Sequence, residues 1–446
     1  MDPVPLTAVA AAAAIRRGKL TAEEVVAACL ERIAEREPVV GAWAFLDRDH
    51  AVGQAREADA ARRAGRELGP LDGIPVGVKD IFDTADMPTE NGTVLHAGRQ
   101  PTEDAAAVAL LRAAGAIVLG KTVTTELAVY WPGKTRNPHD PRRTPGGSSS
   151  GSAAAVAAGM VPLALGTQTN GSVIRPAAYC GVVGYKPTYG LISRHGALRQ
   201  SPPLDQVGVF ARSLEDVALL GEALMVYDER DAAMRPRARP RLRDAVAATP
   251  PVPPRLAFVR TPMWEQAEPD VRAAFPALVA QLGNRAVEVE LPPIFAHAVG
   301  WHRTIMEADL AKSFAAEYAA GRDRLSPRLS EMIERGQAYR AVEYNEALEA
   351  VPQLHRALAP IFAAYDALVT PATTGAAPIG LESTGSPIFC TIWTLCGVPA
   401  VSLPILRGAE AMPLGVQLVA ARGDDGRLLR AARWLVEQGP VPSRVR

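Results

Sequence analysis

The sequence predicts an α/β protein in which helices cover a central β-sheet. Two apolar segments, Gly73–Val78 (GIPVGV) and residues 116–120 (AIVLG), have the length and β-branched content of buried strands. An alanine-rich segment over 105–114 is typical of a helix, and Gly115 ends it just before the second strand. The same order of helix, glycine and strand recurs over 152–166. Such alternation is characteristic of layered α/β architecture.

The other segments extend this pattern towards both ends of the chain. Residues 5–35 are expected to be helical, and Thr21–Glu24 (TAEE) is a capping box that starts a second helix. The further expected elements are a helix over 213–224, a Pro/Arg-rich loop over 230–254, a β–α–β excursion from the main sheet over 255–291, a helical stretch over 300–366, strands at 366–372 and 400–405, and a last helix over 425–438.

Composition and charge narrow the class of protein. The chain has 446 residues, of which 48% are hydrophobic and 22% charged, as in ordinary globular proteins. Its 48 Lys and Arg residues balance 48 Asp and Glu residues, whereas a nucleic-acid-binding protein usually carries a basic excess. The arginine-rich run at 235–243 lies among prolines and is typical of an exposed loop. We therefore expect no nucleic-acid partner.

The cysteines and the N-terminus indicate the compartment. Cys29, Cys180, Cys390 and Cys396 are too few and too scattered for a disulfide framework, which favours a reducing environment. The alanine-rich N-terminal run is followed by basic residues rather than preceded by them, which is the wrong order for a secretory signal. No apolar stretch is long enough to span a bilayer. We expect a cytoplasmic protein without a membrane partner.

Two Gly/Ser-rich segments are the candidates for chemistry. Residues 145–159 read PGGSSSGSAAAVAAG and residues 166–181 read GTQTNGSVIRPAAYCG, and each lies at a junction between expected elements. Ser172 stands where a helix begins, and Lys79 follows an apolar strand in which burial would keep its amine neutral. From these residues alone, a Ser/Lys hydrolase, structural turns and, for 145–159, a flexible linker all remain open. None of the seven histidines lies in a motif that would support a histidine-based catalytic triad.

Several ordered motifs resemble the amidase signature family. They are GPLDGIPVGVKDIFDT (69–84), AIVLGKTVTTELA (116–128), RNPHDPRRTPGGSSSGSAAAVAAG (136–159), GTQTNGSVIRPAAYCGVVGYKPTYG (166–190) and FARSLEDVALL (210–220), with a weaker match in LCGVPAVSLP (395–404) and PLGVQLV (413–419). Lys79 and Ser148 are 69 positions apart, and Ser148 and Ser172 are 24 apart, as in that family. This agreement in order and spacing favours a catalytic turn over a linker.

The resemblance implies a fold and a set of roles. It implies a three-layer α/β/α fold with a large mixed sheet, a single domain over 1–446, a signature core at about 69–220 and a variable pocket region at about 230–366. Lys79 would be the base, Ser148 the bridging serine after a cis peptide bond, and Ser172 the nucleophile. The main-chain N–H groups around Thr169, Asn170, Gly171 and Ser172 would form the oxyanion hole. No metal and no organic cofactor is implied.

The second motif departs from the common family form, G-T-D-T-G-G-S-I-R. Gln168 replaces Asp, Asn170 replaces Gly, Ile174 replaces Arg, and an arginine follows one place later at Arg175. This variant resembles the malonamidase branch, which implies that Arg175 holds a substrate carboxylate, while a purely structural role for Arg175 stays open. The resemblance also places the pocket walls in the variable region and near Tyr130, Trp131 and Trp393.

These observations lead to one main function and to two alternatives. We expect an amidase that hydrolyses the C–N bond of a small amide or urea-type substrate, with a carboxylate on the substrate, through an acyl-enzyme. The first alternative is an amidotransferase A-type subunit that supplies ammonia to a partner enzyme, which the variant motif disfavours. The second is a non-catalytic assembly component, which the intact Lys/Ser/Ser set disfavours. A homodimer is the expected assembly.

Overall fold

A central mixed sheet organises the chain in the computed structural model, which describes residues 6–439. Within those residues, 11 strands form one sheet in the order β1-β3-β2-β4-β6-β5-β10-β11-β9-β7-β8. The strands are β1 (Trp43–Leu46), β2 (Pro75–Lys79), β3 (Ile117–Thr122), β4 (Leu163–Gln168), β5 (Val183–Lys186), β6 (Gln206–Ala211), β7 (Leu256–Phe258), β8 (Ala286–Glu288), β9 (Ala367–Pro371), β10 (Ala400–Arg407) and β11 (Pro413–Val419).

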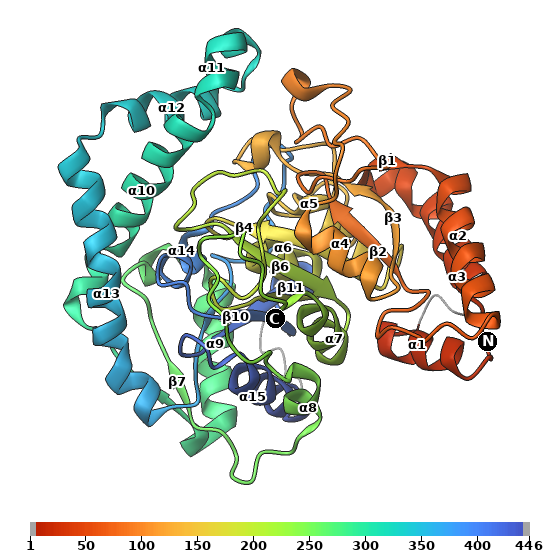
Figure 1. The fold of residues 1–446 in the computed structure, drawn as a ribbon. Coiled ribbons are helices and arrows are strands. Elements are labelled where there is room, and N and C mark those ends of the chain that lie inside the picture. Colours follow the sequence, from red (N-terminus) through yellow and green to blue (C-terminus); the bar gives the residue numbers. More distant parts are fainter. Residues whose placement is uncertain (1–5, 440–446) are drawn as a thin grey trace.

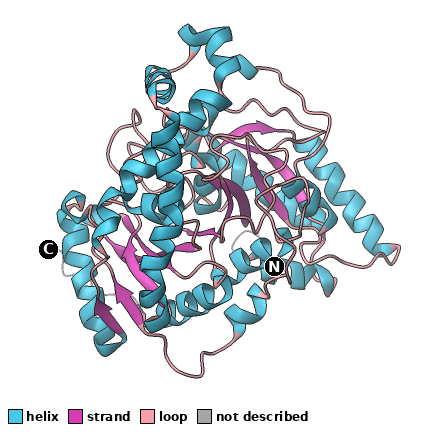
Figure 2. Cartoon of the chain, turned by 60° about the vertical axis from the view of Figure 1, so that its left-hand side comes forward, coloured by secondary structure: helices cyan, strands magenta, loops and turns pink. Residues whose placement is uncertain are grey.

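The strand directions divide the sheet into parallel and antiparallel parts. Strand β2 runs parallel to both β3 and β4, and β7 runs parallel to β8 and β9. The strands between these two groups, from β4 through β6, β5, β10 and β11 to β9, pair antiparallel. The sheet is therefore mixed, as expected, and Figure 2 shows its strands enclosed by helices.

Alternating side chains place hydrophobic core on both faces of the sheet. Val401 and Leu403 of β10 pack into one cluster, whereas Ala400 packs into another. In β4, Leu163 and Leu165 likewise face the first cluster, and Ala164 faces a third. Because successive side chains of a strand point to opposite faces, a sheet buried on both sides needs a helical layer on each. This confirms the expected three-layer α/β/α fold.

The helices that supply these layers are distributed along the whole chain. They are α1 (Ala8–Arg16), α2 (Ala22–Val40), α3 (Arg48–Arg63), α4 (Ala106–Ala113), α5 (Ser150–Ala157), α6 (Ile174–Cys180), α7 (Leu214–Leu224), α8 (Leu242–Ala247), α9 (Pro269–Leu282), α10 (Ala298–Ser313), α11 (Ala315–Gly321), α12 (Pro327–Ala338), α13 (Ala341–Ala364), α14 (Ile388–Leu395) and α15 (Asp425–Glu437). Figure 1 shows α10 to α13 along one flank of the sheet, opposite α2 and α3.

Local sequence accounts for several boundaries. Thr21 and Glu24 form the expected capping box of α2, in which each side chain accepts a hydrogen bond from the other residue's main-chain N–H. The expected helix over 5–35 is divided by a turn at 17–21 into α1 and α2, and its first residue lies outside the described residues. The expected elements at 105–120 correspond closely to α4 and β3.

The segment over 255–291 departs in one respect from its expected place. It forms the expected unit, because β7 and β8 flank α9 and pair in parallel. It is not an excursion from the sheet, however, since β7 also pairs with β9 and so extends the main sheet to its edge. The arginine-rich run at 235–243 is largely exposed, as expected. The expected loop over 230–254 is interrupted, however, by the short helix α8, which begins at Leu242 and buries Leu242 and Val246.

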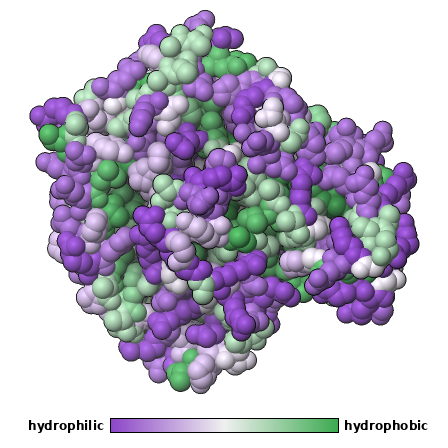
Figure 3. Space-filling view, viewed as in Figure 1, coloured by the Kyte–Doolittle hydropathy of each residue, from purple (hydrophilic) through white to green (hydrophobic). Residues whose placement is uncertain are grey.

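The surface gives no sign of a membrane span. No helix among residues 6–439 combines the length and the apolar character that crossing a bilayer requires. The face drawn in Figure 3 is mostly hydrophilic, and hydrophobic residues gather chiefly in its recesses.

Candidate active site

Lys79 lies at the carboxyl end of β2, in the centre of the candidate site. Its side chain is fully buried, with Nζ 2.6 Å from Ser148 Oγ and 2.8 Å from Thr167 Oγ1. Thr167 belongs to β4, which runs parallel to β2, so both strands deliver their last residues to the same edge of the sheet. The structure thus brings together the predicted base and the predicted bridging serine.

The surroundings of Lys79 favour its neutral form. Burial lowers the pKa of Lys79 well below its usual value, and the charge of Asp205 opposes this shift only in part. Its two partners are hydroxyl groups, which donate as well as accept hydrogen bonds. A neutral lysine amine can therefore accept a proton from Ser148, which is the behaviour of a general base.

The segment that carries Ser148 is buried and tied to the sheet. Residues 143–156 are buried, and the Gly147–Ser148 peptide bond is cis. Gly146 has φ of 84°, and a Cβ atom placed there would lie 2.9 Å from Pro176 Cα, so only glycine fits. Ser149 Oγ accepts from the N–H of Thr167 at 3.2 Å and ties the turn to β4. The linker interpretation of 145–159 is therefore wrong.

Ser172 lies in the tight turn between β4 and α6. The Gln168 side chain holds this turn, because its Oε1 accepts from the N–H groups of Val173 and Ile174 at 2.9 and 3.0 Å. Gln168 thereby caps the first turn of α6. No hydrogen bond joins Ser172 to Ser148 within residues 6–439. The contact through which Ser172 would pass its proton to Ser148 is therefore not formed in this structure. Such bonds are often long before substrate binds.

Side chains of α10 and α14 form hydrogen bonds to two main-chain carbonyl groups of this turn. The imidazole Nε2 of His302, in α10, lies 2.9 Å from the Thr169 carbonyl, and Thr394 Oγ1, in α14, donates to the Asn170 carbonyl. In a trans peptide the N–H points away from the C=O of the same unit. The N–H groups of Asn170 and Gly171 therefore point away from these partners, and they have no acceptor among the described residues. This is the arrangement an oxyanion hole requires.

The sequence does not identify His302 and Thr394 as residues of the site. His302 is 133 positions from Thr169, and Thr394 is 224 positions from Asn170, so no local motif connects them. Burial lowers the pKa of His302 to about 4, which makes the ring neutral at ordinary pH. Because a carbonyl oxygen only accepts, the proton must lie on Nε2. His302 is therefore a fixed donor and not a proton carrier.

A cavity of about 690 Å³ opens beside this turn. Its wall includes Tyr130 and Trp131, as expected, and Asn170 of the turn that carries Ser172. Asn170 Nδ2 donates to the Tyr130 hydroxyl at 2.8 Å, and its Oδ1 accepts from Thr391 at 2.7 Å. The rest of the wall comes from α10, α12, the loop before α14 and α14 itself. Residues 230–297, the first part of the expected pocket region, do not line this cavity.

Trp393 does not lie where the sequence analysis expected it. Its side chain is fully buried in the hydrophobic core and does not line the cavity. Thr391, on the same helix, does line it. Two residues along an α-helix are separated by roughly 200°, so Trp393 faces the opposite side of α14. The expectation that Trp393 contacts substrate is corrected accordingly.

Arg175 is held by the protein itself. Its Nη1 donates to the Thr384 carbonyl at 2.7 Å and also to Gly385, while Nη2 donates to the Gly147 carbonyl at 2.8 Å. The side chain is 1% exposed and does not line the cavity. Of the two roles left open for Arg175, these contacts favour the structural one, in which it fastens the loop before α14 to the turn of Ser148.

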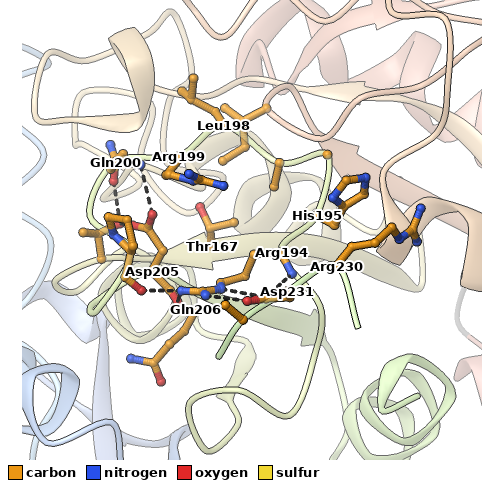
Figure 4. A pocket seen from close by; sticks show the side chains of 16 residues that line it. Thr167, Arg194, His195, Leu198, Arg199, Gln200, Asp205, Gln206, Arg230 and Asp231 are labelled. Carbon is orange, nitrogen blue, oxygen red and sulfur yellow. Dashed lines mark hydrogen bonds and ion pairs between the residues drawn. The ribbon is translucent and has the colours of Figure 1, made fainter. Parts of the chain in front are cut away.

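A second cavity, of about 230 Å³, also lies beside the candidate site. Thr167 and Thr169 line it, so Thr167 separates it from Lys79. Figure 4 shows Arg194 and Asp231 paired within it, with Asp205 close by. The polar side chains in its interior are hydrogen-bonded to one another or to main chain, which indicates a supporting network.

Comparison with known proteins identifies the family. The family model described as Amidase matches residues 24–429. The chain belongs to the amidase signature family. Peptide amidase from Stenotrophomonas maltophilia has a similar structure, with a TM-score of 0.83, 30% identity, and 97% of each chain covered. The family and its structures support an amidohydrolase, and the malonamidase-like branch remains a prediction.

Other relatives are parts of larger assemblies. The A subunit of glutamyl-tRNA(Gln) amidotransferase from Symbiobacterium thermophilum is 37% identical, with 94% of each protein covered. Its counterpart from Rhodopirellula baltica is 36% identical, with 93% of this chain and 92% of that protein covered. This chain is also similar in structure to a chain of a vestigial protein complex that reveals the evolutionary origins of an s-triazine catabolic enzyme. The TM-score is 0.90 at 28% identity, with 98% of this chain and 99% of that chain covered.

These relatives correct the expected partners. A protein named as the A subunit of an amidotransferase for glutamyl-tRNA(Gln) works with other subunits and with tRNA. The prediction of a homodimer without a nucleic-acid partner is therefore wrong. A balanced net charge misled that prediction because one component of an assembly can leave contact with nucleic acid to its partner chains.

Proposed function

We propose that this chain is the amidase component of a larger assembly, in which it hydrolyses a small carboxamide and supplies the released ammonia to a partner chain. The observation that carries the proposal is the 2.6 Å contact between Lys79 Nζ and Ser148 Oγ beside the turn of Ser172. The chain is similar over nearly its whole length to A subunits of amidotransferases, and this similarity supports the proposal that a partner chain receives the ammonia.

The chemistry follows from these residues. Neutral Lys79 takes a proton from Ser148, which takes one from Ser172 as the Ser172 oxygen attacks the amide carbon. The N–H groups of Asn170 and Gly171 stabilise the negative charge that develops on the carbonyl oxygen. The relay then returns the proton to the leaving nitrogen as the C–N bond breaks and ammonia departs. Water attacks the acyl-enzyme by the same relay and releases the carboxylic acid.

A free-standing amidase is the second candidate. It is supported by the structural similarity to peptide amidase and to 6-aminohexanoate cyclic dimer hydrolase, whose structure gives a TM-score of 0.87 at 26% identity. Its substrate would be a small amide or urea-type compound. Under either candidate the catalytic steps are the same, and the cytoplasmic location remains a prediction.

The test measures ammonia release from primary amides by the purified chain, alone and as the assembly isolated from its own organism. We expect Ser172→Ala to abolish release and any acyl-enzyme seen by intact-mass spectrometry. Lys79→Ala and Ser148→Ala should each lower kcat by about a thousandfold or more, as for other residues of an activated nucleophile. Full activity in Ser172→Ala would refute the mechanism.

The role of the partner has a separate readout. We expect the isolated assembly, supplied with glutamyl-tRNA, ATP and an amide donor, to transfer the amide nitrogen to the tRNA-bound glutamate. Transfer should be absent when the assembly carries Ser172→Ala. Ammonia release by the chain alone, with no transfer by the assembly, would favour the free-standing amidase instead.

A further inference from the structure

The side chain of Asn170 is held at both ends, at the place where the cavity of about 690 Å³ meets the turn of Ser172. Its Nδ2 donates to the Tyr130 hydroxyl at 2.8 Å, and its Oδ1 accepts from Thr391 Oγ1 at 2.7 Å. All three residues line the cavity, and Asn170 is only 8% exposed. The Asn170 amide therefore cannot leave its place without breaking at least one of these two hydrogen bonds.

This side chain also lies next to the atoms that would react. The main-chain N–H of Asn170 is one of the two groups that would bind the oxygen of the substrate carbonyl, and Asn170 precedes Ser172 by two residues. The side chain begins on the Cα atom that carries this N–H. A primary carboxamide releases ammonia, which needs little space, so the acyl group is the part that extends into the cavity. The first carbon of the acyl group must therefore pass beside the Asn170 amide.

The rest of the cavity imposes no comparable restriction. Its volume of about 690 Å³ is in the range of sites that hold drug-sized ligands, so the cavity as a whole can accept a long acyl group. The restriction is local to the turn and concerns the width of the acyl group beside the carbonyl carbon. A glycine at position 170, as in the common form of this motif, would place no side chain there.

We propose that Asn170, fixed between Tyr130 and Thr391, makes this chain select amides that are unbranched at the carbon next to the carbonyl group. The inference rests on the proposed amidase function and adds a residue that determines its specificity. A linear acyl group carries two hydrogens at that carbon and can lie against the Asn170 amide. A methyl branch would collide with the amide or displace the carbonyl oxygen from the N–H groups of the turn. One methyl group in a tight site changes kcat/KM by about tenfold or more.

The test compares butanamide with 2-methylpropanamide, which contain the same atoms and differ only in the branch. We expect the unmodified chain to favour butanamide at least tenfold in kcat/KM. Asn170→Gly and Asn170→Ala should each reduce this preference to about threefold or less, because the branched amide gains space. Thr391→Val releases one end of the Asn170 side chain and should give an intermediate preference. The ratio between the two amides is the readout, since loss of the hydrogen bonds lowers the rate on both.

A matched control enlarges the cavity at another point of its wall. Val299 of α10 lines the cavity and has no hydrogen-bonded side chain, and Val299→Ala should keep the preference for butanamide. A preference that falls as far in Val299→Ala as in Asn170→Ala would show that the cavity as a whole is selective. Equal kcat/KM for the two amides in the unmodified chain, or an unchanged preference in Asn170→Gly, would also overturn the proposal.

Binding supplies a readout that does not depend on turnover. NMR titration of Ser172→Ala should show butanamide bound at least tenfold more tightly than 2-methylpropanamide, and the Ser172→Ala/Asn170→Gly double variant should bind both about equally. If the unmodified chain hydrolyses neither amide but binding shows this dependence on Asn170, the proposed function fails and the steric role of Asn170 stands. If the two amides bind equally, or neither binds, the steric role is refuted.

Discussion

Three buried lysines differ in what surrounds their amines. Lys121 is bound by the Phe82 and Pro88 carbonyls and lies 3.6 Å from Asp80, and Lys186 is bound by the Val398 carbonyl. Carbonyl oxygens only accept, so these contacts stabilise an ammonium group. Lys79 has only hydroxyl partners, which stabilise the neutral amine equally well. Burial lowers the pKa of all three lysines, so it is the partner atoms that favour Lys79 as the proposed base.

The pH dependence of the reaction should report Lys79. The base must be neutral, so kcat/KM should fall as the pH drops through the pKa of Lys79. Asp205 raises that pKa by its charge. In Asp205→Asn the charge is removed, and we expect the acid limb of the profile to move to lower pH. The measurement is kcat/KM from pH 5 to 9 for both proteins.

Two results would contradict this assignment. A rate that stays constant down to pH 5 in the unmodified chain would argue against a lysine base. A limb that moves to higher pH in Asp205→Asn would show that Asp205 does not act on Lys79 by its charge. Thermal melting of Asp205→Asn serves as the control, because Asp205 also accepts from the N–H groups of Gln200 and Ser201.

At the scale of elements, helices far away in sequence fix the turn between β4 and α6. Helix α10 contributes His302 and α14 contributes Thr394, and each holds a carbonyl of the turn. Gln168, at the end of β4, links α14 to the start of α6. Its Nε2 donates to Thr394 Oγ1 of α14 at 2.9 Å, while its Oε1 accepts from main-chain N–H groups at the start of α6. The position of Ser172, the proposed nucleophile, therefore depends on three elements that meet only in the folded chain.

His302 should act as a positioning residue for the oxyanion hole. In His302→Leu the Thr169 carbonyl loses its donor, and we expect kcat to fall about tenfold to a hundredfold while KM changes little. His302→Gln keeps an N–H donor and should restore much of the loss. The measurement is the split between kcat and KM for the three proteins. Loss in KM alone would show that His302 acts through the substrate cavity, whose wall it also lines, and not through the oxyanion hole.

Stability gives His302 a second readout. Its pKa is about 4 in the folded chain and about 6.5 when unfolded, so below pH 6.5 the unfolded state binds a proton that the folded state does not. Stability should therefore fall between pH 6.5 and 4, by about 3 kcal/mol from this group. His302→Gln lacks this titration, and its melting temperature should fall less over the same range.

At the scale of the whole molecule, the sheet joins the two halves of the chain. The signature core contributes β2 to β6, and the later strands attach to it where β10 pairs with β5. The cavity lies across this junction, since its lining combines Tyr130 and Asn170 with residues of α10, α12 and α14. We propose on this basis that the chain acts as one domain.

Limited proteolysis tests that proposal. The exposed run at 235–241 should be cut first, and the two fragments should remain together in size-exclusion chromatography because the pairing of β5 with β10 holds them. The separated bands should appear only under denaturing conditions. Early cuts within 130–180, or fragments that separate without denaturant, would contradict a single domain.

The sequence by itself determined the layered α/β class, most helices and strands with strong periodicity, the capping box of α2, and the family through the ordered motifs around Lys79, Ser148 and Ser172. These features depend on neighbours within a few residues or on the fixed order of motifs along the chain. Local rules of helix capping, side-chain alternation and turn chemistry are enough to predict them.

The tertiary structure alone decided which side chains face the site. Trp393 is buried in the core, and His302 lies within hydrogen-bond distance of the Thr169 carbonyl. Arg175 donates hydrogen bonds to the carbonyls of Thr384 and Gly147. Each of these outcomes joins residues that lie far apart in the chain or depends on the face that a helix turns towards the sheet. A side chain's partners are set by packing between elements, and a single sequence carries no local signal for that packing.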